Sequence, residues 1–302
     1  MLQCLGWAVF ELIIIATAAA ALSDEVLGFG ARWLWTLVFG AVAIMLALLG
    51  PIGFVRRYVR RFAGWVVLAS LVYLTWWTLS GADLDALWSR PGEGGFPSFW
   101  HGIDLVIASV VSWTPLAADY TRFSRDRRSA FLGTGAGYLV PTIWMFGLGA
   151  ILLLDRGISD PAGIPAAVAA AGLASVLALF ALTVDETDEA FANVYSGAVS
   201  LQNFLPDVPR RLLIAAVSLV ATTGALAIDL GSYQTFLFLL GSFFVPQWLA
   251  PVGPAWWLDL VEPLDPAPLD FSASLPSFAL AFGLAALASY AARRGRTASV
   301  PA

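Results

Sequence analysis

Cysteine, histidine and charged residues are all scarce in this chain of 302 residues. A single Cys4 excludes a disulfide framework and a cysteine-rich metal site. A single His101 leaves no histidine cluster that could hold a metal. Charged residues make up 12% of the chain and its net charge is −5, whereas soluble domains are about 25% charged. No basic tract is present, so the sequence gives no sign of nucleic-acid binding.

Apolar residues dominate what remains. They make up 59% of the chain, with a mean hydropathy of +0.80, compared with roughly 45–50% apolar residues in soluble domains. A bilayer core needs about 20 apolar residues per helix. The sequence therefore predicts an all-α, polytopic protein of the plasma (inner) membrane, with about nine spans. These predicted spans are 2–22, 32–54, 62–80, 102–121, 130–154, 172–203, 211–230, 233–250 and 274–292. An Ala-rich stretch at 162–171 is either a short separate helix or an extension of the span that follows it.

Arginine residues gather in alternate loops between these spans. The Arg-rich segments are 56–61, 122–128 and 210–211. The intervening loops, which carry Asp and Glu with few Arg, are 23–31, 81–100 and 155–165. The positive-inside rule places the Arg-rich loops, and with them Met1, on the cytoplasmic side. A further Arg group at 293–296 falls on the outer side by this count, which leaves the topology of the C-terminal part open.

Glu11 is a carboxylate inside the first predicted span. A charge in a bilayer core costs on the order of 2.5–3.5 kcal/mol on insertion scales, so such residues are functional candidates. Trp7 lies one turn earlier and shares a helix face with Glu11. One interpretation is a ligand that stacks on Trp7 and donates hydrogen bonds to Glu11. The alternative is that Glu11 pairs with another helix for structural reasons, next to an ordinary buried Trp7.

Pro115 interrupts the predicted span 102–121 two residues after Trp113. Proline removes a backbone donor and clashes with the preceding turn. Backbone groups freed in this way are tolerated in a membrane only where they line a cavity or a packed interior. Broken helices build substrate sites in transporters, although a simple proline kink is an equal alternative. Asp119 and Arg122 are three residues apart and can pair, so we interpret them as a structural or gating element.

Acidic residues are densest at 185–189, inside a segment that is otherwise apolar. Such a cluster must face a water-filled cavity, pair with cations or be partly protonated. Thr187 and Asp188 offer hard oxygen ligands for a small cation such as Na⁺, with Val184 as a third candidate ligand. The alternative is a helix break that puts the acids on an aqueous loop. That break would reverse the sidedness of the Arg pair at 210–211.

Asn193 follows the acidic cluster, one helical turn after Glu189. The two side chains share a helix face. An Asn amide both donates and accepts hydrogen bonds, which suits the edge of a heterocyclic amide or an aminopyrimidine. We therefore regard Asn193 and Glu189 as candidate ligand contacts.

These clusters, in this order, resemble the nucleobase:cation symporter family one, and most closely its CytX-like branch, which is associated with hydroxymethylpyrimidine. Residues 6–11 resemble the start of the family's third span, and residues 112–122 resemble the end of its sixth. Residues 185–196 resemble the eighth span, and residues 274–278 resemble the closing span of the branch. The resemblance covers most of the chain, and the motif at 112–122 is the most specific part.

The resemblance implies a role for each matching residue. Trp7 and Trp113 correspond to the family's two Trp residues, which stack on opposite faces of a planar heterocycle. Glu11 and Asn193 correspond to the polar residues that bond the ring. Hydroxyl residues five and six positions before the Asn help bind Na⁺ in the family, and here Asp188 and Thr187 stand there. An Asp in place of a hydroxyl could strengthen cation binding or favour protons as the coupling ion.

The resemblance also implies a LeuT-like fold, an inverted repeat of five plus five helices. The chain begins at what resembles the third span, so we expect it to lack the first two helices, through a start codon assigned too late or a true truncation. We expect one transporter domain over 1–302, with an irregular, proline-rich connection at 251–273.

The function implied is cation-coupled import of a pyrimidine-like heterocycle, such as hydroxymethylpyrimidine, cytosine or a related nucleobase, by alternating access. A carboxylate at Glu11 would favour a cationic or amino-bearing ring. The expected partners are the planar substrate, membrane lipid and Na⁺ or H⁺ as the coupling ion, with no other cofactor, no nucleic acid and no inferable protein partner. One alternative is a non-transporting fragment or degenerate gene product, and another is an amino-acid symporter of the same fold. A membrane-embedded hydrolase ranks last, because no paired nucleophile and base are visible.

Overall fold

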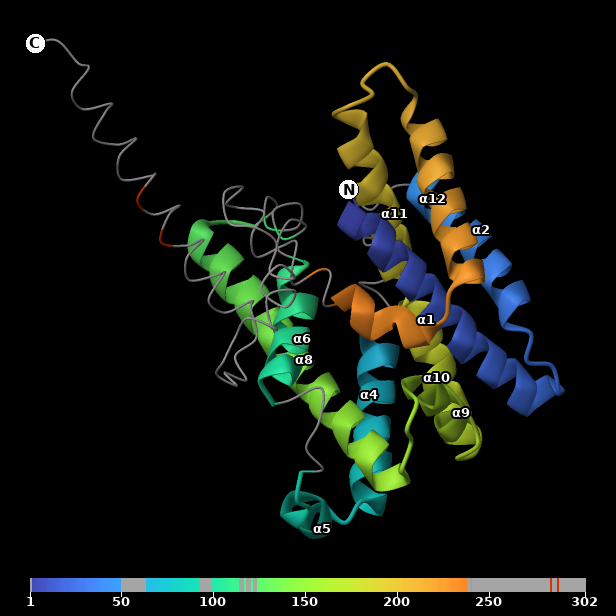
Figure 1. The fold of residues 1–302 in the computed structure, drawn as a ribbon, viewed down its shortest axis with the longest axis vertical. Coiled ribbons are helices and arrows are strands. Elements are labelled where there is room, and N and C mark those ends of the chain that lie inside the picture. Colours follow the sequence, from blue (N-terminus) through green and yellow to red (C-terminus); the bar gives the residue numbers. More distant parts are fainter. Residues whose placement is uncertain are drawn as a thin grey trace, which may run out of the picture. The chain divides into compact units, whose positions relative to one another are not determined.

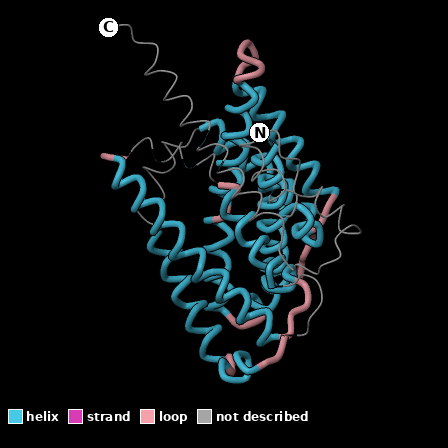
Figure 2. Tube along the Cα trace, turned by 60° about the vertical axis from the view of Figure 1, so that its left-hand side comes forward, coloured by secondary structure: helices cyan, strands magenta, loops and turns pink. Residues whose placement is uncertain are grey.

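The computed structural model describes residues 2–49, 64–92, 99–113 and 124–237, and the single residues 117, 121, 240, 283 and 287. Contacts divide the chain into two units, Met1–Pro91 with Asp126–Ser232 and Gly92–Arg125 with Tyr233–Ala302. Every regular element of the described part is helical (Figures 1 and 2). The prediction of an all-α polytopic membrane protein is confirmed. The single domain over 1–302 stays a prediction, and its connection at 251–273 lies outside the described residues.

In the described part of the chain, five helices are long and apolar enough to cross a membrane, and all belong to the first unit. They are α1 (Leu2–Leu27), α2 (Arg32–Leu49), α4 (Gly64–Gly81), α8 (Arg127–Arg156) and α12 (Arg210–Ala227). Each coincides with one of the predicted spans. Most residues of the predicted spans 233–250 and 274–292 lie outside the described residues.

The predicted span 172–203 forms two helices rather than one. They are α10 (Leu173–Asp185) and α11 (Thr187–Gln202), and Glu186 alone separates them. Glu186 has right-handed helical dihedral angles, φ −57° and ψ −19°, and its N–H donates to the carbonyl of Leu182. A single helical residue cannot reverse the chain, so the alternative of an aqueous loop at the acids is wrong.

Shorter elements make up the rest of the described part of the first unit. They are α5 (Leu84–Ser89), η2 (Pro161–Gly163), α9 (Ile164–Ala169) and η3 (Leu230–Ser232). α9 is the short helix expected at 162–171. It does not extend the next span, because Gly172 has a φ of +106°, a conformation that glycine adopts without strain and that ends helical continuity. In the second unit, α6 (Phe99–Val111) is described.

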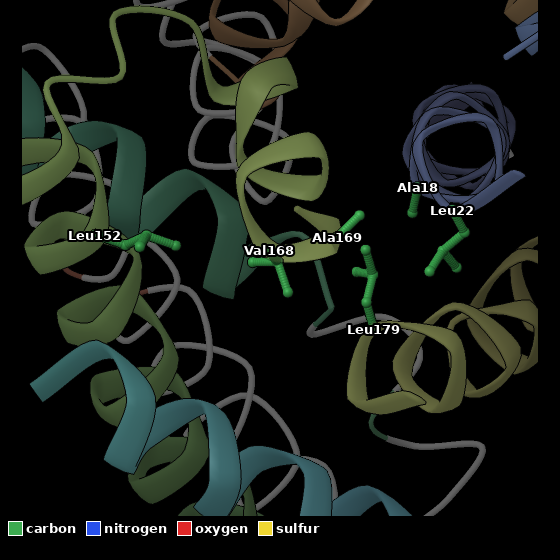
Figure 3. Packing of buried hydrophobic residues seen from close by; sticks show 6 residues of the cluster. All are labelled: Ala18, Leu22, Leu152, Val168, Ala169 and Leu179. Atoms are coloured by element: carbon green, nitrogen blue, oxygen red, sulfur yellow. The ribbon is translucent and has the colours of Figure 1, made fainter. Parts of the chain in front are cut away.

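α1 is the central helix of the first unit. Of an 18-residue apolar stretch long enough to span a membrane, 67% is buried in α1 and only 6% in α8. α1 packs against α2, α9, α10, α11 and α12 (Figure 1). Its run of alanines lets neighbouring helices approach closely, as small residues do in membrane bundles. Near its C-terminal end, Ala18 and Leu22 join a hydrophobic cluster with Leu179 of α10 and Ala169 of α9 (Figure 3).

Outward-facing apolar side chains cover α4 and α8. Trp65 of α4 and Phe131 of α8 are 73% and 78% exposed. Water would make such surfaces unfavourable, but lipid does not. Hydrogen bonds between side chains join α4 to both α10 and α8. The hydroxyls of Tyr73 on α4 and Ser175 on α10 are 3.0 Å apart, and the Trp144 indole on α8 donates to the Thr75 hydroxyl over 2.9 Å.

Both ends of α8 are capped. The Asp126 carboxylate accepts from the backbone N–H of Ser129 over 2.7 Å and from its hydroxyl over 3.1 Å. These bonds hold the pKa of the exposed Asp126 carboxyl below its usual range. At the other end Gly157, in the left-handed region at φ +61°, donates to the carbonyl of Leu153.

We expect Gly40→Ala to destabilise the protein by about 1–3 kcal/mol, as overpacking does. An added Cβ at Gly40 on α2 would collide with the Thr222 hydroxyl of α12, which already donates to the carbonyl of Ser218 over 2.8 Å. Gly133→Ala on α8 is the control, because no described atom lies within 4 Å of its Cβ position. Its unfolding midpoint in detergent should stay unchanged or rise, since alanine favours helices. Equal midpoints for the two variants would contradict the packing of α2 on α12.

The orientation of α8 can be tested with single cysteines. Ser124 and Ser159 flank α8 and are exposed, whereas the native Cys4 is buried. The positive-inside rule places Ser124 in the cytoplasm and Ser159 outside. In intact cells a membrane-impermeant thiol reagent should therefore label Ser159→Cys but not Ser124→Cys, while the parent protein shows the Cys4 background. Labelling of Ser124→Cys but not of Ser159→Cys would show that α8 has the opposite orientation.

Candidate functional site

Glu11 lies well inside α1 and is only 3% exposed. Apolar residues surround it in the sequence, so α1 forms as a continuous helix and carries the carboxylate into the interior. Trp7, one turn earlier, is also buried, at 7% exposed. The predicted pair therefore lies on the buried central helix, and not on a face that lipid would cover.

Asn193 of α11 meets Glu11 directly. Its side-chain Nδ2 donates to Glu11 Oε1 over 2.8 Å and to Oε2 over 3.1 Å, and both side chains are buried. These residues are 182 positions apart. The structure thus brings together two polar residues that sequence reasoning had singled out separately, although it does not test what they bind. The contact also agrees with the alternative that Glu11 pairs with another helix for structural reasons, because one contact can both stabilise the fold and take part in binding.

The two polar atoms of the Asn193 side chain differ in their hydrogen bonding, because Nδ2 has partners and Oδ1 has none among the described residues. Its Nδ2 also donates to the backbone carbonyl of Glu189 over 3.4 Å. Its Oδ1 is buried, and no described group donates to it. A buried acceptor without a partner is costly. It is therefore a position where a hydrogen-bond donor of a ligand would be favourable.

The acidic cluster surrounds the junction of α10 and α11. Asp185 ends α10, Glu186 forms the junction, and Asp188 and Glu189 lie in the first turn of α11. Acidic side chains in the first helical turn are favoured by the helix dipole. All four side chains are half-buried. The predicted contact Glu189 lies one turn from Asn193, but the interaction seen between them uses the Glu189 backbone.

The cation candidates Val184, Thr187 and Asp188 lie at the same junction. The Thr187 hydroxyl donates to the Val184 carbonyl over 2.6 Å, so two of the three proposed oxygens are adjacent. A bound cation would have to replace that hydrogen bond. Among the described residues, no group of three or more His, Cys, Asp or Glu side chains is placed to hold a metal ion. The Na⁺ site, which would use a hydroxyl and a carbonyl, stays a prediction.

Trp113 lies in the second unit, in a turn that directly follows α6. α6 ends at Val111, so the predicted span 102–121 is interrupted before Pro115 is reached. Trp113 is half-buried, and its carbonyl accepts from the N–H of Ala117 over 3.1 Å. Pro115, Asp119 and Arg122 lie outside the described residues, and the gating role assigned to them stays a prediction.

Sequence reasoning missed a buried hydroxyl that is without a partner among the described residues. Ser218 of α12 is fully buried, and its hydroxyl has no partner in the described part of the chain. α12 packs against both α1 and α11. A lone serine in an apolar helix is too common to attract attention, because its hydroxyl usually donates to a carbonyl one turn earlier. No pattern in the sequence could have identified it.

Comparison with known proteins agrees with the resemblance drawn from the motifs. Over 272 residues, the chain is 25% identical to the purine-cytosine permease fcyB of Emericella nidulans. That match covers 83% of this chain and 51% of the relative, so the chain spans about half the length of the curated relative. No solved structure matches. Residues 5–251 match the family described as permeases for cytosine/purines, uracil, thiamine and allantoin. This match includes α1, α6, α10 and α11, and the chain therefore belongs to that permease family.

Proposed function

We propose that the protein imports a pyrimidine-like heterocycle, coupled to a cation, by alternating access. Hydroxymethylpyrimidine, cytosine and related nucleobases are the proposed substrates. The hydrogen bond between Glu11 and Asn193 carries the proposal, because it brings two expected ring contacts to one place beside Trp7. The permease family is one of transporters and not of enzymes, which removes the hydrolase alternative.

Several features support a site of this kind at Glu11. Polar residues are few on α1. A buried carboxylate on such a helix is costly, so it is normally paired or takes part in function. Ligand sites are mostly apolar, with a few placed polar groups that select the ligand. The relative is named a purine-cytosine permease, and cytosine is a ring that carries an amino group. The CytX-like branch and a pyrimidine substrate are the finer part of the proposal.

The coupling cation is proposed to bind at the junction of α10 and α11. Thr187 and the Val184 carbonyl supply adjacent oxygens there, and Asp188 supplies a negative charge. Na⁺ suits this set of hard oxygen ligands, and H⁺ is the alternative for a site rich in carboxylates. Half-buried acids next to a buried polar pair would allow the cation and the ring to influence each other.

A non-transporting membrane protein is the competing hypothesis. It would fold but bind no ring, so no heterocycle would shift its thermal unfolding. An amino-acid symporter is a second competitor, and it predicts that amino acids compete with a radiolabelled ring. Trp7 and Trp113 argue against an amino acid, because flat aromatic faces favour flat ligands.

Trp113→Ala should abolish most ring binding. Base–aromatic stacking is worth about 1–3 kcal/mol per base, so the affinity of the full gene product for radiolabelled cytosine should fall roughly 5- to 150-fold. Trp113→Phe keeps an aromatic face and should lose less. Trp88→Ala is the matched control, since Trp88 of α5 is 95% exposed. Unchanged uptake and affinity in Trp113→Ala would show that Trp113 is not part of the site.

A further inference from the structure

α5 is a short helix that follows α4 at one end of the first unit. α4 ends at Gly81 and α5 begins at Leu84, so the connection between them spans about 10 Å at most. α5 contacts α8, and Figure 1 shows it beside the C-terminal ends of α4 and α8. The positive-inside rule places these ends on the outer side of the membrane. α5 is therefore held close to the outer face of the bilayer.

The sequence of α5 makes this helix amphipathic. With 3.6 residues per turn, Leu84, Leu87 and Trp88 fall within one arc of about 100°. Asp85 and Ser89 fall on the other side of the helix. Leu87 is half-buried, but Leu84 is 46% exposed and Trp88 is 95% exposed. The apolar face of α5 thus points away from the rest of the protein, and an amphipathic helix with such a face is typical of membrane surfaces.

Local hydrogen bonds hold α5 in its helical form. The Asp83 carboxylate accepts from the backbone N–H of Ala86 over 3.0 Å, as an N-cap does. At the other end, the Ser89 hydroxyl donates to the carbonyl of Asp85 over 2.8 Å. These polar groups find their partners within the segment itself. The apolar face can therefore leave water without a polar group of the cap or of Ser89 losing its hydrogen bond.

The exposed apolar face of α5 continues the lipid-facing surface of α4. Most of the large apolar residues exposed on α4 are spaced three or four positions apart and so share one face: Trp65, Leu68, Val72, Trp76 and Leu79. This stripe runs the length of α4 and ends two residues before the helix does. The next exposed apolar side chains along the chain are those of α5. Lipid that covers the stripe on α4 is thus close enough to cover α5 as well.

The ends of α4 and α8 mark the level of the membrane boundary. The 18 residues of α4 rise about 27 Å, close to the roughly 30 Å of a hydrocarbon core. The Arg156 guanidinium of α8 lies over the Trp77 ring of α4, 5.0 Å from its centroid. Arginine extends its charge toward the headgroups, and tryptophan gathers at the same depth. α5 starts just beyond this pair and therefore begins in the headgroup layer.

We propose that α5 is an interfacial helix that binds the outer lipid surface, with Leu84 and Trp88 inserted where the headgroups meet the acyl chains. Its partner is the bilayer that α4 and α8 cross. The contact is apolar, since the charged residue on the opposite face is Asp85, and it needs no anionic lipid. This contact would tie the outer ends of α4 and α8 to the membrane surface. The inference goes beyond the proposed function and does not depend on which ring is carried.

The test places a nitroxide at single positions of the full gene product in phosphatidylcholine vesicles, with Cys4→Ala as the background. Leu84→Cys and Trp88→Cys should collide readily with oxygen, which dissolves in lipid, and rarely with a water-soluble nickel chelate. Asp85→Cys and Ser89→Cys are the matched controls on the polar face, and they should show the reverse. Frequent collision with the chelate at all four positions would place α5 in water. Infrequent collision with both reagents at Leu84 and Trp88 would show that protein covers this face, and either result would overturn the inference.

Tryptophan fluorescence gives a second measurement that needs no label. In vesicles whose lipids carry bromine in the upper acyl chain, Trp88 should be among the quenched tryptophans. Trp88→Phe should therefore lower the quenched fraction of the total emission, because it removes a ring that touches lipid. The substitution leaves the packing intact, since Trp88 is 95% exposed. A quenched fraction that is unchanged or higher in Trp88→Phe would show that the ring lies outside the lipid, and it would contradict the inference without bearing on the proposed function.

Discussion

A buried carboxylate on the central helix is the constraint on which the first unit depends. Glu11 sits on α1, the most buried of the membrane-length helices. A charge at this depth is costly, and a buried carboxylate that loses a hydrogen-bond donor is costlier still. Asn193 meets that cost by donating to both Glu11 oxygens. Because Asn193 belongs to α11, the bond also fixes how α11 lies against α1.

The helices around this bond are arranged by the size of their side chains. Gly40 of α2 lies against Thr222 of α12, and Gly224 of α12 lies against Val9 of α1, where an added Cβ would come within 2.9 Å of a methyl group. Such contacts replace the hydrophobic effect, which does not drive helices together in lipid. The rigid packing of α1, α2, α11 and α12 then holds Glu11 and Asn193 in register. The same residues can therefore serve stability and recognition.

Much of this could be predicted from the sequence, since hydropathy alone places membrane helices. The five long helices follow from runs of apolar residues, which lipid requires. The sequence leaves the division at Glu186 open as one alternative, because four acids within an otherwise apolar segment are compatible with a loop, a kink or a cavity. The contact of Glu11 with Asn193 could be expected only through the family resemblance. Spacing along a chain says nothing about two residues 182 positions apart.

The most direct test of this central bond is a double-mutant cycle on the free energy of unfolding, using Glu11→Ala, Asn193→Ala and the double variant. Residues in direct contact show interaction energies of about 0.5–3 kcal/mol, whereas independent sites add within roughly 0.3–0.5 kcal/mol. We expect a coupling energy in the first range, with the double variant less destabilised than the sum of the single variants. Additive losses would show that Glu11 and Asn193 do not meet, and the site described on α1 and α11 would then be wrong.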